Sequence, residues 1–137
     1  MVAYAKSMGL DKHIYFLGFV SPQELAWLYR NSSCLSFFSI GGPNNYPPIE
    51  AISLGCPIVV SDIEGHRQQL GAAALYASPM DPAAWAEQLS KVIADSQEVR
   101  ATLDEGKTLI SNLSVDIYLG KVFDTIESII KYRRLWS

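Results

Sequence analysis

Residues 39–55 contain the residue types and spacing best suited to binding a phosphorylated ligand. Gly41 and Gly42 allow the backbone to approach a ligand closely, because glycine adopts conformations closed to other residues. A helix beginning at Pro47 or Pro48 would follow, presenting unsatisfied N–H groups and the positive end of its dipole. This arrangement predicts a site for phosphate or another anion.

Glu50 is the acidic residue of this segment, and we expect it in the first turn of the helix. A carboxylate there would repel a phosphate on the helix axis, so its sensible partner is a neutral hydroxyl-bearing group such as a ribose. Acidic residues in first turns also complement the helix dipole without binding a ligand. Spacing alone leaves both interpretations of Glu50 open.

The elements that must position this segment alternate along the chain. Short runs rich in aromatic and branched residues predict four strands, at residues 13–17, 34–38, 57–60 and 73–76. Apolar residues at helical spacing and helix-capping residues predict helices at 2–9, 22–31, 47–54, within 62–71, from 82 onward, at 96–112 and at 115–134. The alternation predicts an α/β fold with a Rossmann-like parallel sheet and flanking helices.

The loop at residues 41–46 leaves the carboxyl end of a predicted strand, where ligands bind in open parallel sheets. We interpret residues 1–137 as a single partial domain with its core in 8–112 and a last helix at 115–134. Four strands are few for an open doubly wound sheet, which has about five or six. The domain is therefore either unusually small or without its first strands.

The composition limits the classes of partner. A net charge of -3 gives no basic face for nucleic acid, so we expect none. Cys34 and Cys56 lie in apolar runs and are interpreted as buried free thiols of a reducing compartment. The first residues do not resemble a signal peptide, and no run approaches the length of a membrane span. We therefore expect a cytoplasmic protein.

Four stretches taken in order resemble the C-terminal domain of family-4 (group 1) glycosyltransferases: FLGFVS, PPIEA, LGCPIVVSD and GHRQQLGAAALY. The resemblance covers residues 8 to about 95. It implies half of a GT-B fold, in which this domain binds a nucleotide-diphosphate sugar across a cleft from a separate acceptor domain. It also implies retaining transfer to a glycan or lipid-linked acceptor, as in polysaccharide biosynthesis, with no metal and no cofactor other than the donor substrate.

The resemblance assigns roles to single residues of the segment. Glu50 matches the second glutamate of the E-x7-E motif of the family, which holds the ribose hydroxyls. The first glutamate falls on Gly42, which puts recognition of the donor sugar in doubt. The segment that approaches the sugar and diphosphate is implied to contain these residues: Gly41, Gly42, Asn44, Asn45, Tyr46 and Pro47.

Three further residues have two interpretations each, and a fourth has one. His66 would either line the donor cleft or be a satisfied structural histidine. Phe19 would lie against the nucleobase or pack under its loop. Arg67 is the nearest candidate to neutralise the diphosphate, although a loop cation is more often only solvated. His13 is expected to be structural.

Two alternatives to a transferase domain stay open at this point. One is a non-catalytic module that binds a nucleotide or a partner protein; the other, weaker one is an epimerase of GT-B type. The isolated chain is expected to be inactive without an acceptor domain, and an uncovered sheet edge predicts self-association. The basic, aromatic C-terminal residues 131–136 would either touch the inner face of an anionic membrane or end a helix that packs back on the domain.

Overall fold

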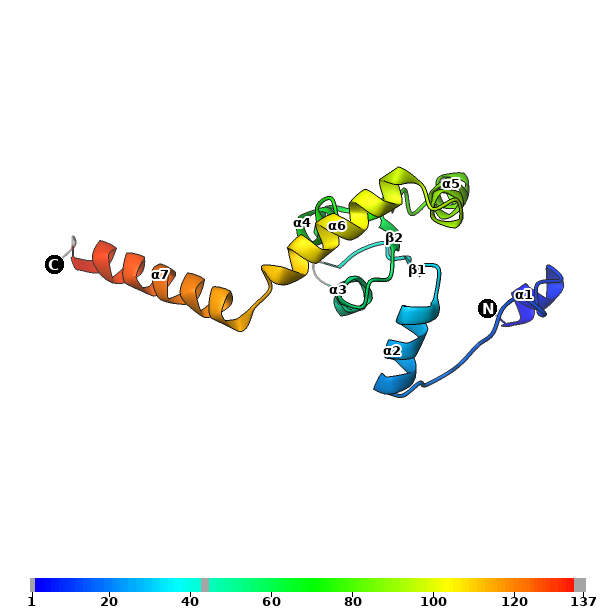
Figure 1. Ribbon diagram of the computed structural model, residues 1–137, viewed down its shortest axis with the longest axis horizontal. Helices are drawn as coiled ribbons and strands as arrows, with labels where there is room; N and C mark the ends of the chain where they lie inside the picture. The colour runs from blue at the N-terminus through cyan, green and yellow to red at the C-terminus, as the bar shows by residue number, and fades with distance from the viewer. Residues whose placement is uncertain (1, 43–44, 135–137) are drawn as a thin grey trace.

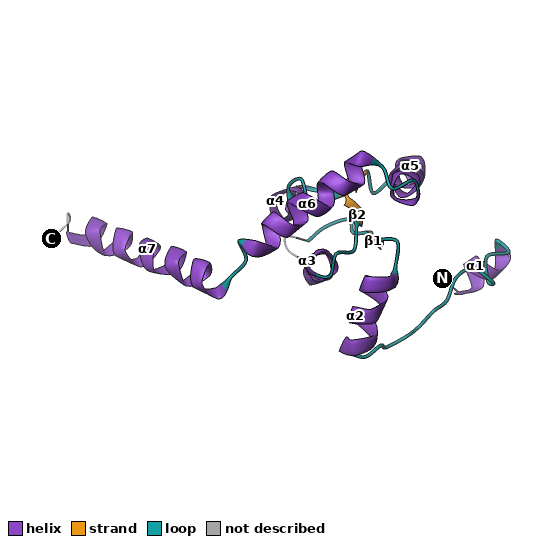
Figure 2. Ribbon diagram, in the orientation of Figure 1, coloured by secondary structure: helices purple, strands orange, loops and turns teal. Residues whose placement is uncertain are grey.

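The computed structural model describes residues 2–42 and 45–134, and in these ranges the chain forms seven helices and three strands (Figures 1 and 2). In chain order the elements are α1 (Val2–Ser7), α2 (Pro22–Asn31), β1 (Leu35–Phe37), α3 (Tyr46–Ser53), β2 (Ile58–Ser61), α4 (Glu64–Leu70), β3 (Leu75–Ala77), α5 (Pro82–Ile93), α6 (Gln97–Ser111) and α7 (Val115–Arg134). The predicted α/β fold with a parallel sheet is confirmed.

The three strands form one parallel sheet in the order β1-β2-β3. Leu35 of β1 pairs with Ile58 of β2, and Val59 of β2 pairs with Leu75 of β3. Every residue of β2 is buried, as expected for a central strand whose two faces are both covered by helices. The carboxyl ends of the three strands therefore meet at one edge of the sheet.

Helices cover the two faces of the sheet with separate apolar clusters. Ile58 and Val60 pack with residues of α2, α3 and α6. Val59, between them in the chain, packs with residues of α5 on the other face, as the alternation of side chains along a strand requires. Cys34 and Cys56 are free and pack in different clusters. The prediction of a buried free thiol is confirmed for Cys56, whereas Cys34 is only partly buried.

Local capping signals fix the helix ends as expected. At α2 the Ser21 hydroxyl accepts the Glu24 N–H, while the Glu24 carboxylate accepts the Ser21 N–H at 2.7 Å. Asp81 caps α5 by accepting two backbone N–H groups. Gly55, with a φ of +77°, follows α3 in a conformation that favours glycine.

The predicted strand at residues 13–17 is wrong. This segment has no strand pairing, and its apolar side chains are exposed, including Tyr15, Phe16 and Leu17. It runs between α1 and α2 away from the sheet (Figure 1), so no neighbouring backbone is available for a ladder. The apolar pattern showed a segment able to form a strand, but a strand also needs a partner. The sheet of the described chain has three strands, not four.

Of the two interpretations of the C-terminal residues, the one in which the last helix packs back on the domain is also wrong. The helix forms at the predicted residues, but α7 projects beyond α6 and away from the sheet (Figure 1). Its apolar stripe is exposed, including Tyr118, Phe123, Ile126 and Ile129. Within the described residues, no helix has both the length and the apolar character needed to cross a membrane.

Gly106 marks the place where α6 packs directly on α3. A Cβ atom at this position would lie 2.8 Å from Cγ2 of Ile52, closer than atoms of real side chains approach. Ile52 is β-branched and has little freedom to move aside within a helix. Glycine is therefore required at this crossing for reasons of space.

Replacing this glycine should destabilise the fold. Gly106→Ala adds helix propensity worth about 1 kcal/mol, but overpacking a tight contact costs about 1–3 kcal/mol. We expect a lower free energy of unfolding, measured by urea denaturation followed by circular dichroism. In the matched control Gly120→Ala, the new Cβ meets no atom within 4 Å, so stability should stay equal or rise. Equal stability of the Gly106→Ala variant and the native chain would contradict the packing argument.

Candidate functional site

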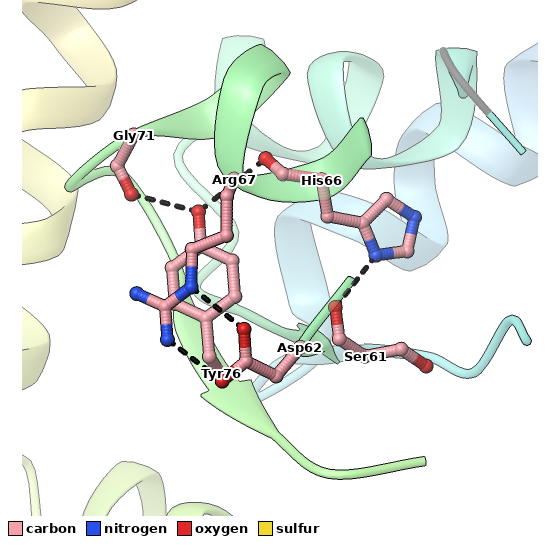
Figure 3. Close-up of polar contacts among 6 residues, drawn as sticks. All are labelled: Ser61, Asp62, His66, Arg67, Gly71 and Tyr76. Carbon is pink, nitrogen blue, oxygen red and sulfur yellow. Dashed lines mark hydrogen bonds and ion pairs between the residues drawn. The ribbon is translucent and has the colours of Figure 1, made fainter. Parts of the chain in front are cut away.

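Ser61 ends the central strand and anchors two elements at the carboxyl edge of the sheet. It is fully buried, and its hydroxyl accepts the N–H of Ser39 at 2.8 Å, which fixes the loop that leaves β1. Its backbone carbonyl lies 2.9 Å from Nδ1 of His66, in α4 (Figure 3). The loop after β1 and the helix after β2 are thus both tied to this residue.

His66 is fully buried, and its surroundings determine which ring nitrogen holds the proton. A carbonyl only accepts, so Nδ1 must carry the proton and donate it to Ser61. In the neutral ring Nε2 is then an acceptor, and the side-chain amide nitrogen of Asn45 lies 3.0 Å from it. With both nitrogens engaged inside the protein, the structure agrees with the structural interpretation of His66.

Asn45 precedes α3 and is held by α4 through two side chains. Besides its contact with His66, its backbone N–H donates to Oε1 of Gln69 at 3.0 Å, and its carbonyl accepts from Nε2 of Gln69 at 2.9 Å. Gln69 thereby satisfies both backbone groups of Asn45, much as a neighbouring strand would. The entry into α3 is fixed from the side of α4.

The N-terminus of α3 differs from the expectation. The helix begins at Tyr46 rather than at Pro47 or Pro48. The two prolines have no N–H, and Gln69 takes the N–H of Asn45, so of the first three helical residues only Tyr46 carries an N–H. This helix end offers its dipole and a single backbone donor, not the set of N–H groups expected from the sequence.

Glu50 consequently lies in the second turn of α3 and not in the first. The favourable interaction of a carboxylate with the helix dipole falls off within the first turn, so the dipole interpretation of Glu50 loses most of its support. The carboxylate is exposed, and its Oε2 accepts a long hydrogen bond of 3.4 Å from the hydroxyl of Tyr29. Glu50 is thus oriented by a neighbouring helix while remaining open to solvent.

Tyr29 belongs to α2 and is the residue that steadies Glu50. Its ring is buried in the cluster under α3, with the hydroxyl directed at the carboxylate. Burial, and after it the negative charge of Glu50, raise the pKa of Tyr29. The phenol therefore stays protonated near neutral pH and acts as a donor to Glu50.

Arg67 is engaged by other groups (Figure 3). Its guanidinium forms two hydrogen bonds with Asp62, at 2.7 and 2.9 Å, and lies over the ring of Tyr76 at 3.8 Å from the ring centroid. The hydrogen bonds from Arg67 hold the pKa of Asp62 below its ordinary value. One edge of the guanidinium is bonded to Asp62 and one face lies on Tyr76, so Arg67 is oriented by these neighbours, although the side chain is 53% exposed.

The remaining candidates lie around this cluster or apart from it. Gly41 and Gly42 are exposed in the loop before α3, while Asn44 lies outside the described residues. Phe19 is 96% exposed in the irregular segment before α2, so it packs under no loop in this chain. His13 is exposed in a turn and takes no part in the cluster. Among the described residues, no three His, Cys, Asp or Glu side chains gather in a way that would hold a metal.

A pocket of about 750 Å³ adjoins the cluster. On one side its lining comes from Asn45, α3 and α4, with Asn45, Tyr46, Ile49 and Gln69. On the other side it comes from the α6–α7 connection and the start of α7, with Asn112, Leu113, Ser114, Val115, Ile117, Tyr118 and Lys121. Glu50 is not part of this lining. The N-terminus of α3 therefore faces a hollow whose far wall depends on the start of α7.

Sequence reasoning missed three residues of the cluster: Tyr29, Ser61 and Gln69. Tyr29 has the spacing of an ordinary apolar residue of its helix, and Ser61 follows a strand like many buried serines. Gln69 has no sequence signal at all, since its partner lies 24 positions away. The parallel sheet alone suggested that the loop after β1 and the segment after β2 would lie close together, because both leave the same edge of the sheet.

Comparisons with known proteins identify the family of the chain. A family model described as "Glycosyl transferases group 1" matches residues 1–108. The O-antigen chain mannosyltransferase RfbU of Salmonella typhimurium is 33% identical over 111 residues, which are 75% of this chain and 31% of that protein. A D-inositol 3-phosphate glycosyltransferase of Corynebacterium efficiens is 30% identical over 68% of this chain and 22% of its own length.

A solved structure supports the fold. Sucrose-phosphate synthase from Thermosynechococcus elongatus aligns with a TM-score of 0.76 and 20% sequence identity, over 93% of this chain and 33% of that one. The chain spans about a third or less of the length of the proteins that it matches. With most of its residues inside the family match, the chain belongs to the group 1 glycosyl transferases.

Proposed function

We propose that this chain is the donor-binding part of a retaining glycosyltransferase, which transfers a sugar from a nucleotide-diphosphate sugar to a glycan or lipid-linked acceptor. One observation carries the proposal: at the carboxyl edge of the sheet, an exposed carboxylate stands one turn behind the positive end of α3. On one helix, the N-terminus would then bind a negatively charged group of the ligand, and Glu50, one turn later, would bind hydroxyl groups.

Glu50 is proposed to hold the ribose hydroxyls. Its distance from the first turn keeps its charge away from a phosphate at the helix end, and the hydroxyl of Tyr29 occupies Oε2 only through a long contact of 3.4 Å. A carboxylate accepts several hydrogen bonds at once, so it can keep Tyr29 and still accept from a ribose. The family motif that Glu50 matches has this role.

The N-terminus of α3 is proposed to face the diphosphate, with the helix dipole and the N–H of Tyr46 stabilising the charge that develops on the leaving group. A single N–H is a weak anion site by itself. Since Arg67 is engaged by Asp62, the further positive charge should come from parts of the enzyme other than this cluster.

The relatives support the class of reaction. Their names describe transfer of mannose to an O-antigen chain and glycosyl transfer to an inositol phosphate. Both are glycosyl transfers, so the proposal assumes a carbohydrate or lipid-linked hydroxyl as acceptor. We propose that a separate acceptor domain meets this chain across the donor site, and the exposed apolar faces of α7 and of residues 14–19 offer surface for it.

Three further expectations stay predictions. Self-association is still expected, now from exposed apolar faces rather than from a strand edge alone. A cytoplasmic location is also still expected. So is contact with an anionic membrane, which depends on the end of α7, where the side chains of residues 132–134 and all of 135–137 lie outside the described part. The alternative of a non-catalytic module predicts the same nucleotide contacts without turnover.

Removing the carboxylate of Glu50 should weaken nucleotide binding. We expect Glu50→Ala to raise the Kd for UDP or GDP by about tenfold or more, because hydrogen bonds to a charged group contribute about 1.5–3 kcal/mol. The Kd is measured by calorimetry, and amide shifts of residues 45–51 report the place of binding. The matched control is Glu105→Gln, an exposed acidic residue of α6, which should bind as the native chain does.

The ligand itself provides a second control. With the 2′,3′-dideoxy form of the nucleotide, the native chain and Glu50→Ala should bind equally, since the hydroxyls that Glu50 would hold are gone. If Glu50→Ala lost as much affinity for the dideoxy nucleotide as for the ordinary one, the ribose assignment would be wrong. If neither UDP nor GDP shifts residues 45–51, the chain does not bind a donor by itself and the proposed function fails.

Arg67→Ala should affect stability and not binding. The pair with Asp62 is more than a third exposed, so its loss should cost about 1 kcal/mol or less. The pKa of Asp62 is lowered in the folded state, so the pair stabilises the fold above the ordinary pKa of aspartate and ceases to do so as pH falls through the lowered value. Urea unfolding at neutral and acid pH measures this difference; a large rise in the Kd for nucleotide would instead make Arg67 a donor contact.

A further inference from the structure

Gly42 lies at a position where any side chain would point toward the side chain of Asn45. A Cβ atom built at Gly42 would lie 3.7 Å from the amide nitrogen and 3.9 Å from the amide oxygen of Asn45. The φ of Gly42 is +131°, a conformation that favours glycine, so the loop is adapted to having no side chain here. The amide of Asn45 borders the space that a longer residue at position 42 would fill.

The orientation of this amide follows from a chain of hydrogen bonds. The carbonyl of Ser61 places the proton of His66 on Nδ1, which leaves Nε2 as an acceptor. Nε2 then requires a donor from Asn45, so the amide nitrogen turns toward His66 at 3.0 Å and the carbonyl oxygen turns away from it. Because His66 is fully buried, water does not compete for this arrangement.

The backbone of Asn45 is fixed as well. Its N–H and its carbonyl are both bonded to Gln69, so the side chain starts from a defined position. Asn45 itself is only partly buried and lines the pocket at the end of α3. A neutral acceptor oxygen is thus presented at the loop in a set direction, and a sugar hydroxyl is one of the donor groups from which such an oxygen accepts a hydrogen bond.

We propose that the side-chain oxygen of Asn45 binds a hydroxyl of the donor sugar and replaces the missing side chain at Gly42, with His66 as the positioning residue that aims it. This inference rests on the proposed donor site. Asn45 acts by direct contact with the sugar, whereas His66 acts only through Asn45. Different residues then recognise the two parts of the donor: Asn45 binds the sugar, while Glu50 and the N-terminus of α3 bind the nucleotide.

The test compares a nucleotide sugar with its bare nucleotide, using UDP-glucose against UDP and GDP-mannose against GDP. For the pair that binds, the Kd of the bare nucleotide divided by the Kd of the nucleotide sugar measures how much affinity the sugar adds. Asn45→Ala should reduce this ratio by about two- to tenfold, the range expected for one hydrogen bond between neutral groups. In Asn45→Ala the Kd of the bare nucleotide should change little. In Glu50→Ala the Kd values of the nucleotide and of the nucleotide sugar should rise by the same factor.

Two variants of His66 separate positioning from folding. His66→Asn keeps a donor near the place of Nδ1, and with it the bond to Ser61, but loses the acceptor at Nε2. His66→Gln places an amide oxygen near Nε2 and should again accept from Asn45. We expect the first variant to lose the contribution of the sugar as Asn45→Ala does, and the second to keep it, with urea unfolding showing that both variants stay folded.

The outcomes distinguish the two proposals. If nucleotides bind but Asn45→Ala leaves the ratio unchanged, or lowers both affinities alike, the role of Asn45 is wrong and the donor site stands. Native binding that is no tighter with the sugar than without it overturns the inference in the same way. If no nucleotide binds at all, the proposed function fails and this inference fails with it.

Discussion

The hydrogen bond between the carbonyl of Ser61 and the buried ring of His66 is the contact on which the candidate site depends. It joins the end of the central strand to α4, and α4 in turn holds Asn45 and the start of α3 through His66 and Gln69. The same serine fixes the loop after β1 through its hydroxyl. The central strand, the loop after β1 and two helices are therefore connected through Ser61. Among the described residues, no buried side-chain polar atom is left without a hydrogen-bond partner.

The fold was predictable where the signals are local. The capping box at Ser21, the N-cap at Asp81 and the stop at Gly55 depend on residues a few positions apart, and each of them is present in the structure. The segment at 13–17 and α7 show the limit of such signals. Their apolar patterns are real, but whether a partner strand or a neighbouring surface covers them is not written in the segments themselves.

The site was predictable to the level of the segment and not of its contacts. Glu50 and the loop before α3 were found from residue types and family resemblance, yet a start of the helix at Tyr46 moved Glu50 into the second turn and left few N–H groups at the helix end. Under the proposed function, this difference means that side chains, more than the backbone at the start of the helix, would orient the ligand. Those side chains, Tyr29 and Asn45, are set by partners more than 20 positions away.

The most direct test of this account is the protonation state of His66. In a ¹⁵N-labelled chain, long-range proton–nitrogen correlation spectra near neutral pH distinguish a protonated ring nitrogen from a bare one, and His66→Asn assigns the signals, since the only other histidine is His13. We predict a single form of His66 with its proton on Nδ1, because the carbonyl of Ser61 accepts that proton and Nε2 accepts from Asn45. A proton on Nε2 would contradict the account.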